Sequence, residues 1–126
     1  MAKEVVYSAD APDPIGPYSQ AIKVGNMLFI SGQVAIQKPS GQVISGNVVD
    51  EATQVMKNLE AVLKAGGMTF ANIVKTTIFL KDMNDFHKVN EVYGAYFDTA
   101  PPARETVEVS RLPKDGNVEI SCIAVA

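Results

Sequence analysis

The chain has 126 residues with one His, one Cys and no Trp, and its 11 Lys and Arg against 14 Asp and Glu give a net charge of −3. One Cys and one His cannot supply a four-ligand zinc site, and a lone Cys cannot form a disulfide within the chain, so we expect a cytoplasmic protein without such a metal site. The acidic balance, the dispersed basic residues and the lack of an apolar run of roughly 20 residues argue against nucleic-acid and membrane partners.

We expect one domain over residues 1–126 that starts with a stiff loop and two strands. Three prolines and a glycine in residues 11–17 indicate this loop, because proline neither continues a helix nor pairs in a central strand. Strands are predicted at 18–24 and 27–32, joined by a tight Gly-Asn turn. Residues 37–47, which hold Pro39, Gly41 and Gly46, are predicted to form a loop.

Two amphipathic helices follow from the spacing of apolar residues. Residues 52–63 repeat apolar side chains at i, i+3, i+4 and i+7, which predicts a helix with Asp50 as its N-cap. The glycines at 66–67 supply its end. A second apolar stripe predicts a helix over 84–97.

Three further strands are predicted at 72–81, 105–109 and 118–125. In the first of them, one face carries Val74, Thr76, Ile78 and Leu80. The strand at 118–125 is at least partly apolar on both faces, which favours burial of its second face against another subunit over ordinary surface hydrophobicity. The predicted fold class is α+β, with both helices on one face of the sheet.

Two charged residues are candidates for chemistry. Arg104 follows a stiff Pro-Pro-Ala approach, and its planar fork suits a small carboxylate. A surface salt bridge to Glu105 or Glu108 is the simpler alternative. Glu119 lies in an otherwise apolar strand, where it is either a solvated carboxylate or a partly buried general acid or base with a raised pKa.

Four other residues are weaker candidates. Ser31 offers a hydroxyl at a strand end, and Gly32 allows a ligand to approach the backbone closely. Tyr18 follows the proline loop and suits either a pocket wall or the core. Asn90 interrupts the apolar stripe of the second helix, as an interface amide or as a boundary residue.

Six short segments carry a family resemblance. They are Ile15-Gly16-Pro17-Tyr18-Ser19-Gln20, Ser31-Gly32-Gln33, Val74-Lys75-Thr76-Thr77, Val89-Asn90-Glu91-Val92-Tyr93, Pro102-Ala103-Arg104 and Val107-Glu108-Val109-Ser110-Arg111-Leu112-Pro113-Lys114-Asp115. In this order and spacing, from about residue 8 to 125, the sequence resembles the RidA family, also called the YjgF family.

The resemblance implies a fold and an activity. The fold is chorismate-mutase-like, with a mixed sheet of about six strands, two helices on one face, and a homotrimer with clefts between subunits. The last strand inserts centrally in the sheet, beside the strand of Ser31. The implied activity is 2-iminobutanoate/2-iminopropanoate deaminase. Such an enzyme hydrolyses reactive enamine and imine products of pyridoxal-phosphate enzymes to 2-oxo acids and ammonia, with no cofactor and no metal.

The resemblance also implies roles for individual residues. Arg104 would hold the substrate carboxylate, assisted by the backbone N–H of Gly32. Glu119 would position or deprotonate the attacking water, or pass a proton to the leaving ammonia. Positions that match other cleft residues of the family are Tyr18, Ser31 and Asn90.

The sequence departs from the family pattern at three places. Thr106 stands where many members carry Cys, which removes any thiol role but leaves its backbone able to line the cleft. Ser121 stands where many carry Glu, and the segment at 98–102 looks shorter than in some relatives. Two other functions remain open: a module that binds 2-oxo acids to regulate a metabolic enzyme, and an endoribonuclease. The net charge, the single His and the scattered basic residues disfavour the endoribonuclease.

Overall fold

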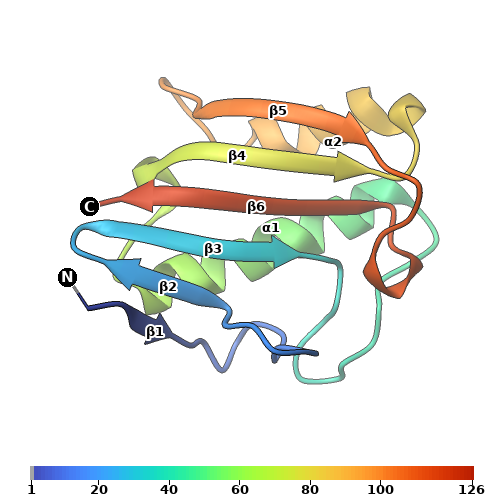
Figure 1. Cartoon of the computed structure of the whole chain (residues 1–126). Coiled ribbons are helices and arrows are strands. Elements are labelled where there is room, and N and C mark those ends of the chain that lie inside the picture. The colour runs from blue at the N-terminus through green and yellow to red at the C-terminus, as the bar shows by residue number, and fades with distance from the viewer. Residues whose placement is uncertain (1) are drawn as a thin grey trace.

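The computed structural model describes residues 2–126, which form a six-stranded sheet with two α-helices on one face (Figure 1). The strands are β1 (Glu4–Val6), β2 (Ala21–Val24), β3 (Met27–Gln33), β4 (Ile73–Leu80), β5 (Ala103–Glu108) and β6 (Val118–Val125). The helices are α1 (Val48–Ala65) and α2 (Phe86–Gly94), and short 3₁₀ turns occupy Phe70–Asn72, Met83–Asp85 and Pro113–Asp115. The α+β class and the single covered face are confirmed.

The sheet is mixed, with the strand order β1-β2-β3-β6-β4-β5. Only β4 and β5 run parallel, and the other neighbours are antiparallel. The last strand, β6, lies between β3 and β4 in the middle of the sheet (Figure 1). This confirms the central insertion that the resemblance implied, and it brings the C-terminal strand beside the strand that carries Ser31.

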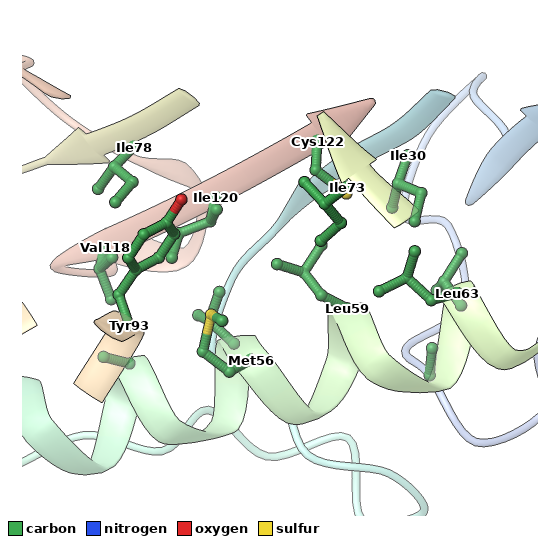
Figure 2. Packing of buried hydrophobic residues seen from close by; sticks show 14 of the residues in the cluster. Ile30, Met56, Leu59, Leu63, Ile73, Ile78, Tyr93, Val118, Ile120 and Cys122 are labelled. Atoms are coloured by element: carbon green, nitrogen blue, oxygen red, sulfur yellow. The ribbon is translucent and has the colours of Figure 1, made fainter. Parts of the chain in front are cut away.

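The core lies between α1 and the covered face of the sheet. Figure 2 shows Met56, Leu59 and Leu63 of α1 pointing at residues of the central strands, among them Ile120 and Cys122. These five side chains are all buried. Burying a side chain of this size contributes about 1.5–3 kcal/mol relative to leaving it in water, so the α1 stripe is a main source of stability.

Both helices differ from their predicted bounds. The N-cap of α1 is Asn47 and not Asp50, because the Asn47 side chain accepts the backbone N–H of Asp50 at 2.8 Å. Asp50 lies in the first turn instead, where the helix dipole favours a negative charge. The helix expected over 84–97 begins at Phe86 after a 3₁₀ turn and ends at Gly94, a residue type of low helix propensity.

One member of the predicted strand face at 72–81 does not share that face in the structure. A bulge between Ile73 and Lys75 shifts the pairing of β4 with β6. As a result Ile73 is buried while Val74 is 48% exposed. The other members of the predicted face are buried as expected: Thr76, Ile78 and Leu80.

Three strand assignments also change. β1, at three residues, is too short to show an alternating pattern, and no strand is predicted there. β2 begins at Ala21 rather than 18, since Gln20 turns inward and is only 2% exposed. Its side chain accepts the Ser8 N–H at 2.6 Å and donates to the Pro12 carbonyl at 2.9 Å, which fixes the proline loop to the sheet. β5 spans Ala103–Glu108 rather than 105–109.

The second face of the sheet has no covering layer within residues 2–126. Phe29 and Val107 on this face remain 41% and 40% exposed. The residues of β6 alternate as expected between buried and partly buried positions. Burial of this face against another subunit stays a prediction. No helix in the described chain is both long and apolar enough to cross a bilayer.

Candidate functional site

A hollow of about 330 Å³ lies where β3 ends and β6 begins. Four of the predicted site residues line it, and we call them the glutamate half-site: Tyr18, Ser31, Gly32 and Glu119. The other walls are largely apolar and come from Pro12, Asp13, Ile15, Gln20, Gln33, Val34, Ile36 and Pro113. The hollow therefore combines two carboxyl groups, of which Asp13 pairs with Lys38, with a mostly apolar lining.

The Glu119 carboxyl lies directly over Gly32. A Cβ atom added at Gly32 would lie 2.7 Å from the Glu119 Cδ atom, so a larger residue cannot share this space with the carboxyl group. A bulge between Ile30 and Gln33 takes the intervening residues out of regular pairing with β6. The glycine and the bulge together let the carboxyl group lie across β3.

Glu119 is partly buried and has no charged partner within residues 2–126. Burial raises the pKa of its carboxyl group above the ordinary value, because water no longer stabilises the charge fully. A carboxyl group in this state exchanges a proton more readily near neutral pH than a solvated one. The structure thus favours the acid–base alternative for Glu119 over the solvated one.

Replacing Gly32 with Ala is expected to displace the Glu119 side chain rather than unfold the sheet. The clash falls on the flexible end of that side chain, which has room to turn toward solvent. The pKa of Glu119 then falls toward its ordinary value, and the melting temperature changes little. Titration by carbon-13 NMR and thermal unfolding measure both effects. A large drop in Tm with an unchanged pKa would contradict this account.

Ser31 and Tyr18 form fixed walls of the glutamate half-site. The Ser31 hydroxyl donates to the Ser19 carbonyl at 2.6 Å, which leaves its lone pairs as acceptors. The Tyr18 hydroxyl accepts the Ile15 N–H at 3.3 Å, and the residue is 47% exposed. Of the two alternatives for Tyr18, the structure therefore supports the pocket wall and not the core.

Arg104 is held by α2 at the edge of the sheet. Its Nη1 group donates to Asn90 Oδ1 at 2.8 Å. The guanidinium carbon lies 5.0 Å from the centre of the Tyr93 ring and 5.7 Å from that of Phe86, within the range of cation–π attraction. We call Arg104, Asn90 and Thr106, with these two rings, the arginine half-site. One hydrogen bond and two rings orient the guanidinium, while most of its donors stay available.

Neither neighbouring glutamate pairs with Arg104 in the described chain. Glu105 contacts Lys75 at 3.2 Å. Glu108 accepts the Met83 N–H at 2.8 Å. The salt bridge considered for Arg104 is therefore wrong, and its charge is left to a ligand or another chain.

Thr106 and Cys122 are both neutral groups. The Thr106 Oγ1 atom is buried and has no hydrogen-bond partner within residues 2–126. Burial raises the pKa of the Cys122 thiol to about 12, so the thiol stays protonated at neutral pH. Cys122 belongs to the hydrophobic core.

The two half-sites lie on opposite faces of the sheet of one chain. Arg104 pairs in register with Thr76, whose hydroxyl contacts the Tyr93 hydroxyl at 2.7 Å beneath α2. Glu119 pairs in register with Phe79, which alternates with buried residues on either side and so faces away from the helices. Within a single chain, Arg104 and Glu119 therefore cannot reach the same small substrate.

Phe86 and Tyr93 lie beside Arg104 and belong to the candidate site, although their spacing in the sequence predicted only an apolar helix face. Phe86, Asn90 and Tyr93 stand at i, i+4 and i+7, so they share one face of α2. An amide flanked by two aromatic residues on one helix face was the feature of the sequence that could have indicated this part of the site. The apolar walls of the hollow gave no such signal, because Ile15, Ile36 and Pro113 come from separate loops.

The known proteins that resemble this chain do so over nearly its whole length. A mouse protein named 2-iminobutanoate/2-iminopropanoate deaminase is 50% identical over 125 residues, which cover 99% of this chain and 93% of the mouse protein. A Rid-family structure from Yersinia pestis superposes with a TM-score of 0.97 at 46% identity, covering 99% of this chain and 100% of that one. The structure of Escherichia coli TdcF with bound serine superposes with a TM-score of 0.93 at 40% identity and covers 98% of both chains.

The family match spans nearly the whole chain. Residues 8–126 match the family described as Endoribonuclease L-PSP. The relatives, the fold with its central last strand, and the sequence segments around both half-sites agree with that match. The chain belongs to this family, which is also known as the YjgF or RidA family.

Proposed function

We propose that this protein hydrolyses 2-imino acids, such as 2-iminobutanoate and 2-iminopropanoate, to 2-oxo acids and ammonia. One observation carries the proposal. Among residues 2–126, the oriented guanidinium of Arg104 has no carboxylate partner, and the partly buried carboxyl group of Glu119 has no cationic partner. Hydrolysis of a small anionic substrate with a C=N group needs both, because the guanidinium binds the substrate carboxylate and the carboxyl group transfers protons. The free, buried thiol of Cys122 fits action in the reducing cytosol.

We propose further that the two half-sites meet between subunits of a homotrimer. The uncovered sheet face carries exposed apolar residues such as Phe29 and Val107, which a neighbouring copy would bury. In such an assembly the arginine half-site of one subunit faces the glutamate half-site of the next. Each cleft then holds a complete set of groups, which no single chain provides.

The chemistry follows from the groups in this cleft. The Arg104 fork binds the substrate carboxylate through two parallel hydrogen bonds, and the Gly32 N–H supports it. Glu119 takes a proton from water as the water oxygen bonds to the imine carbon. With the imine nitrogen protonated, this addition gives a neutral carbinolamine. Glu119 then returns its proton to the carbinolamine nitrogen, and it takes the hydroxyl proton as the C–N bond breaks, the C=O bond forms and ammonia leaves. Holding substrate and water together contributes most of the acceleration.

A coupled assay tests this function directly. Threonine dehydratase generates 2-iminobutanoate, and release of 2-oxobutanoate is followed while semicarbazide traps the free imine. The wild-type protein is expected to accelerate release and to reduce the trapped fraction. No acceleration at any protein concentration would refute the enzymatic function.

A binding function is the second candidate, and the serine bound to the E. coli relative favours it. The same cleft would then hold a 2-oxo acid without turnover. Titration calorimetry with 2-oxobutanoate, run beside the coupled assay, separates the two. Saturable binding without turnover supports the binding module, and turnover supports the enzyme.

Removing the Asn90 amide is expected to weaken substrate binding. In Asn90→Ala, Arg104 loses its one hydrogen bond and must be ordered by the substrate, so KM rises by about tenfold with little change in kcat. The exposed Asn84 lies in the preceding turn, so Asn84→Ala serves as the matched control and keeps both constants. Unchanged kinetics in Asn90→Ala would remove Asn90 from the site.

A further inference from the structure

A buried carboxylate outside both half-sites has an unusual set of partners. Glu51 lies in the first turn of α1 and is 1% exposed. Its Oε1 atom accepts the backbone N–H of Asn117 at 3.1 Å, and its Oε2 atom accepts the Asn117 Nδ2 group at 2.5 Å. No Lys or Arg pairs with it within residues 2–126. A buried carboxylate is costly unless its hydrogen bonds are all made, so this one depends on Asn117.

Asn117 is fixed from two sides. Besides its two bonds to Glu51, its carbonyl oxygen accepts the backbone N–H of Lys81 at 3.0 Å. It directly precedes β6, and Glu119 follows two residues later. The contact thus fastens the start of the strand that carries the candidate acid–base residue to α1.

The turn before Asn117 is strained. Lys114 and Asp115 have φ values of 61° and 55°, the left-handed region that costs energy for residues other than glycine. Arg111 contacts Asp115 on the surface, where solvent weakens such a bond. Pro113, at the start of this turn, lines the hollow together with Glu119. A strained turn keeps its shape only where its surroundings hold it. Leu112 is buried on one side of this turn, and the Glu51 pair holds Asn117 on the other.

We propose that Glu51 is a positioning residue. Through its two hydrogen bonds to Asn117, it fixes where Pro113 and Glu119 lie in the wall of the hollow. For its effect on turnover this inference rests on the proposed hydrolysis. A catalytic group must be placed within a fraction of an ångström, so a loosened turn lowers the rate even though Glu51 does not touch the substrate.

An exchange of amide and carboxylate tests the pair. Glu51→Gln keeps both bonds, because the Asn117 amide can turn over and present its oxygen to the new NH₂ group. Asn117→Asp sets two carboxyl groups against each other in a partly buried place and breaks the contact. The double variant Glu51→Gln/Asn117→Asp restores one donor facing one acceptor. In the double variant the amide stands at position 51 and the carboxylate at position 117, so the side-chain donor and acceptor of the wild type have exchanged places.

The kinetic outcome distinguishes positioning from plain stability. We expect Asn117→Asp to lower kcat on the order of 10- to 100-fold, and the double variant to recover most of the loss. The control Val62→Ala removes buried volume from α1 far from this contact and should lower Tm without changing kcat. If Asn117→Asp lowers Tm while kcat stays at the wild-type value, Glu51 is only structural.

A second measurement does not depend on turnover. The Glu119 carboxyl group is titrated by carbon-13 NMR in each variant, and its pKa is expected to fall in Asn117→Asp and to return in the double variant. If the wild type hydrolyses no imine, the proposed function fails, yet this titration still decides the positioning role. If Asn117→Asp does not fold, Glu51→Ala and Glu51→Gln replace it, and kcat and the pKa must change in the first and not in the second.

Discussion

Arg104→Ala is expected to lower kcat/KM for 2-iminobutanoate by roughly two to four orders of magnitude. The variant loses a charge-assisted pair of hydrogen bonds to the substrate carboxylate, each of which contributes about 1.5–3 kcal/mol. Arg104→Lys keeps the charge but not the planar fork, so its rate should lie between the two. The coupled assay with varied substrate flux measures these values.

Lys75→Ala is the matched control for Arg104. Lys75 pairs with Glu105 next to Arg104 along β5, but this pair is exposed. Its loss should leave kcat/KM unchanged. A residual rate in Arg104→Ala equal to that of the wild type would show that the carboxylate is held elsewhere.

Glu119→Gln is expected to lower kcat by roughly 10²- to 10⁴-fold with a smaller effect on KM. The amide fills the same space over Gly32 but cannot take a proton from water. The acidic limb of the wild-type pH profile, which reports deprotonation of Glu119, should disappear from the residual activity of the variant. An unchanged pH profile would assign that limb to another group.

Glu119→Gln is expected to raise the stability of the protein at neutral pH although it lowers kcat. Burial raises the folded-state pKa of Glu119 above that of the unfolded chain, so the stability linked to this group is full below the unfolded pKa and is lost as the pH rises through the folded one. The amide in Glu119→Gln does not ionise, so the variant does not lose this stability as the pH rises. The variant should therefore unfold at a higher temperature than the wild type at neutral pH, and the difference should shrink in acid.

Local patterns were sufficient for most of the elements. The apolar spacing within α1 and the alternation in β6 predict which side chains are buried, because those rules act within one element. They fail at Val74, since a bulge is a property of two paired strands and leaves no mark in the sequence of one. The N-cap moved from Asp50 to Asn47 because several polar residues near a helix start compete for the same role.

Sequence patterns and the family resemblance name the candidate site residues, but they do not give the arrangement of these residues in space. Alternation tells which residues of β5 share a face with Arg104, and which of β6 share one with Glu119. It does not tell how β4, lying between them, aligns the two sets. Only the registers with Thr76 and Phe79 show that the two groups face opposite ways. Glu51 was missed for a similar reason, as its partner lies 66 residues away.

The central claim is that each active site takes its guanidinium from one chain and its carboxyl group from another. The direct measurement mixes Arg104→Ala and Glu119→Gln chains, unfolds and refolds them together, and assays the product. With random assortment in a closed ring, about one quarter of the clefts regain an intact pair, so activity should rise to about that fraction of the wild type. If the refolded mixture is no more active than the two variants refolded separately, the site is not shared between chains.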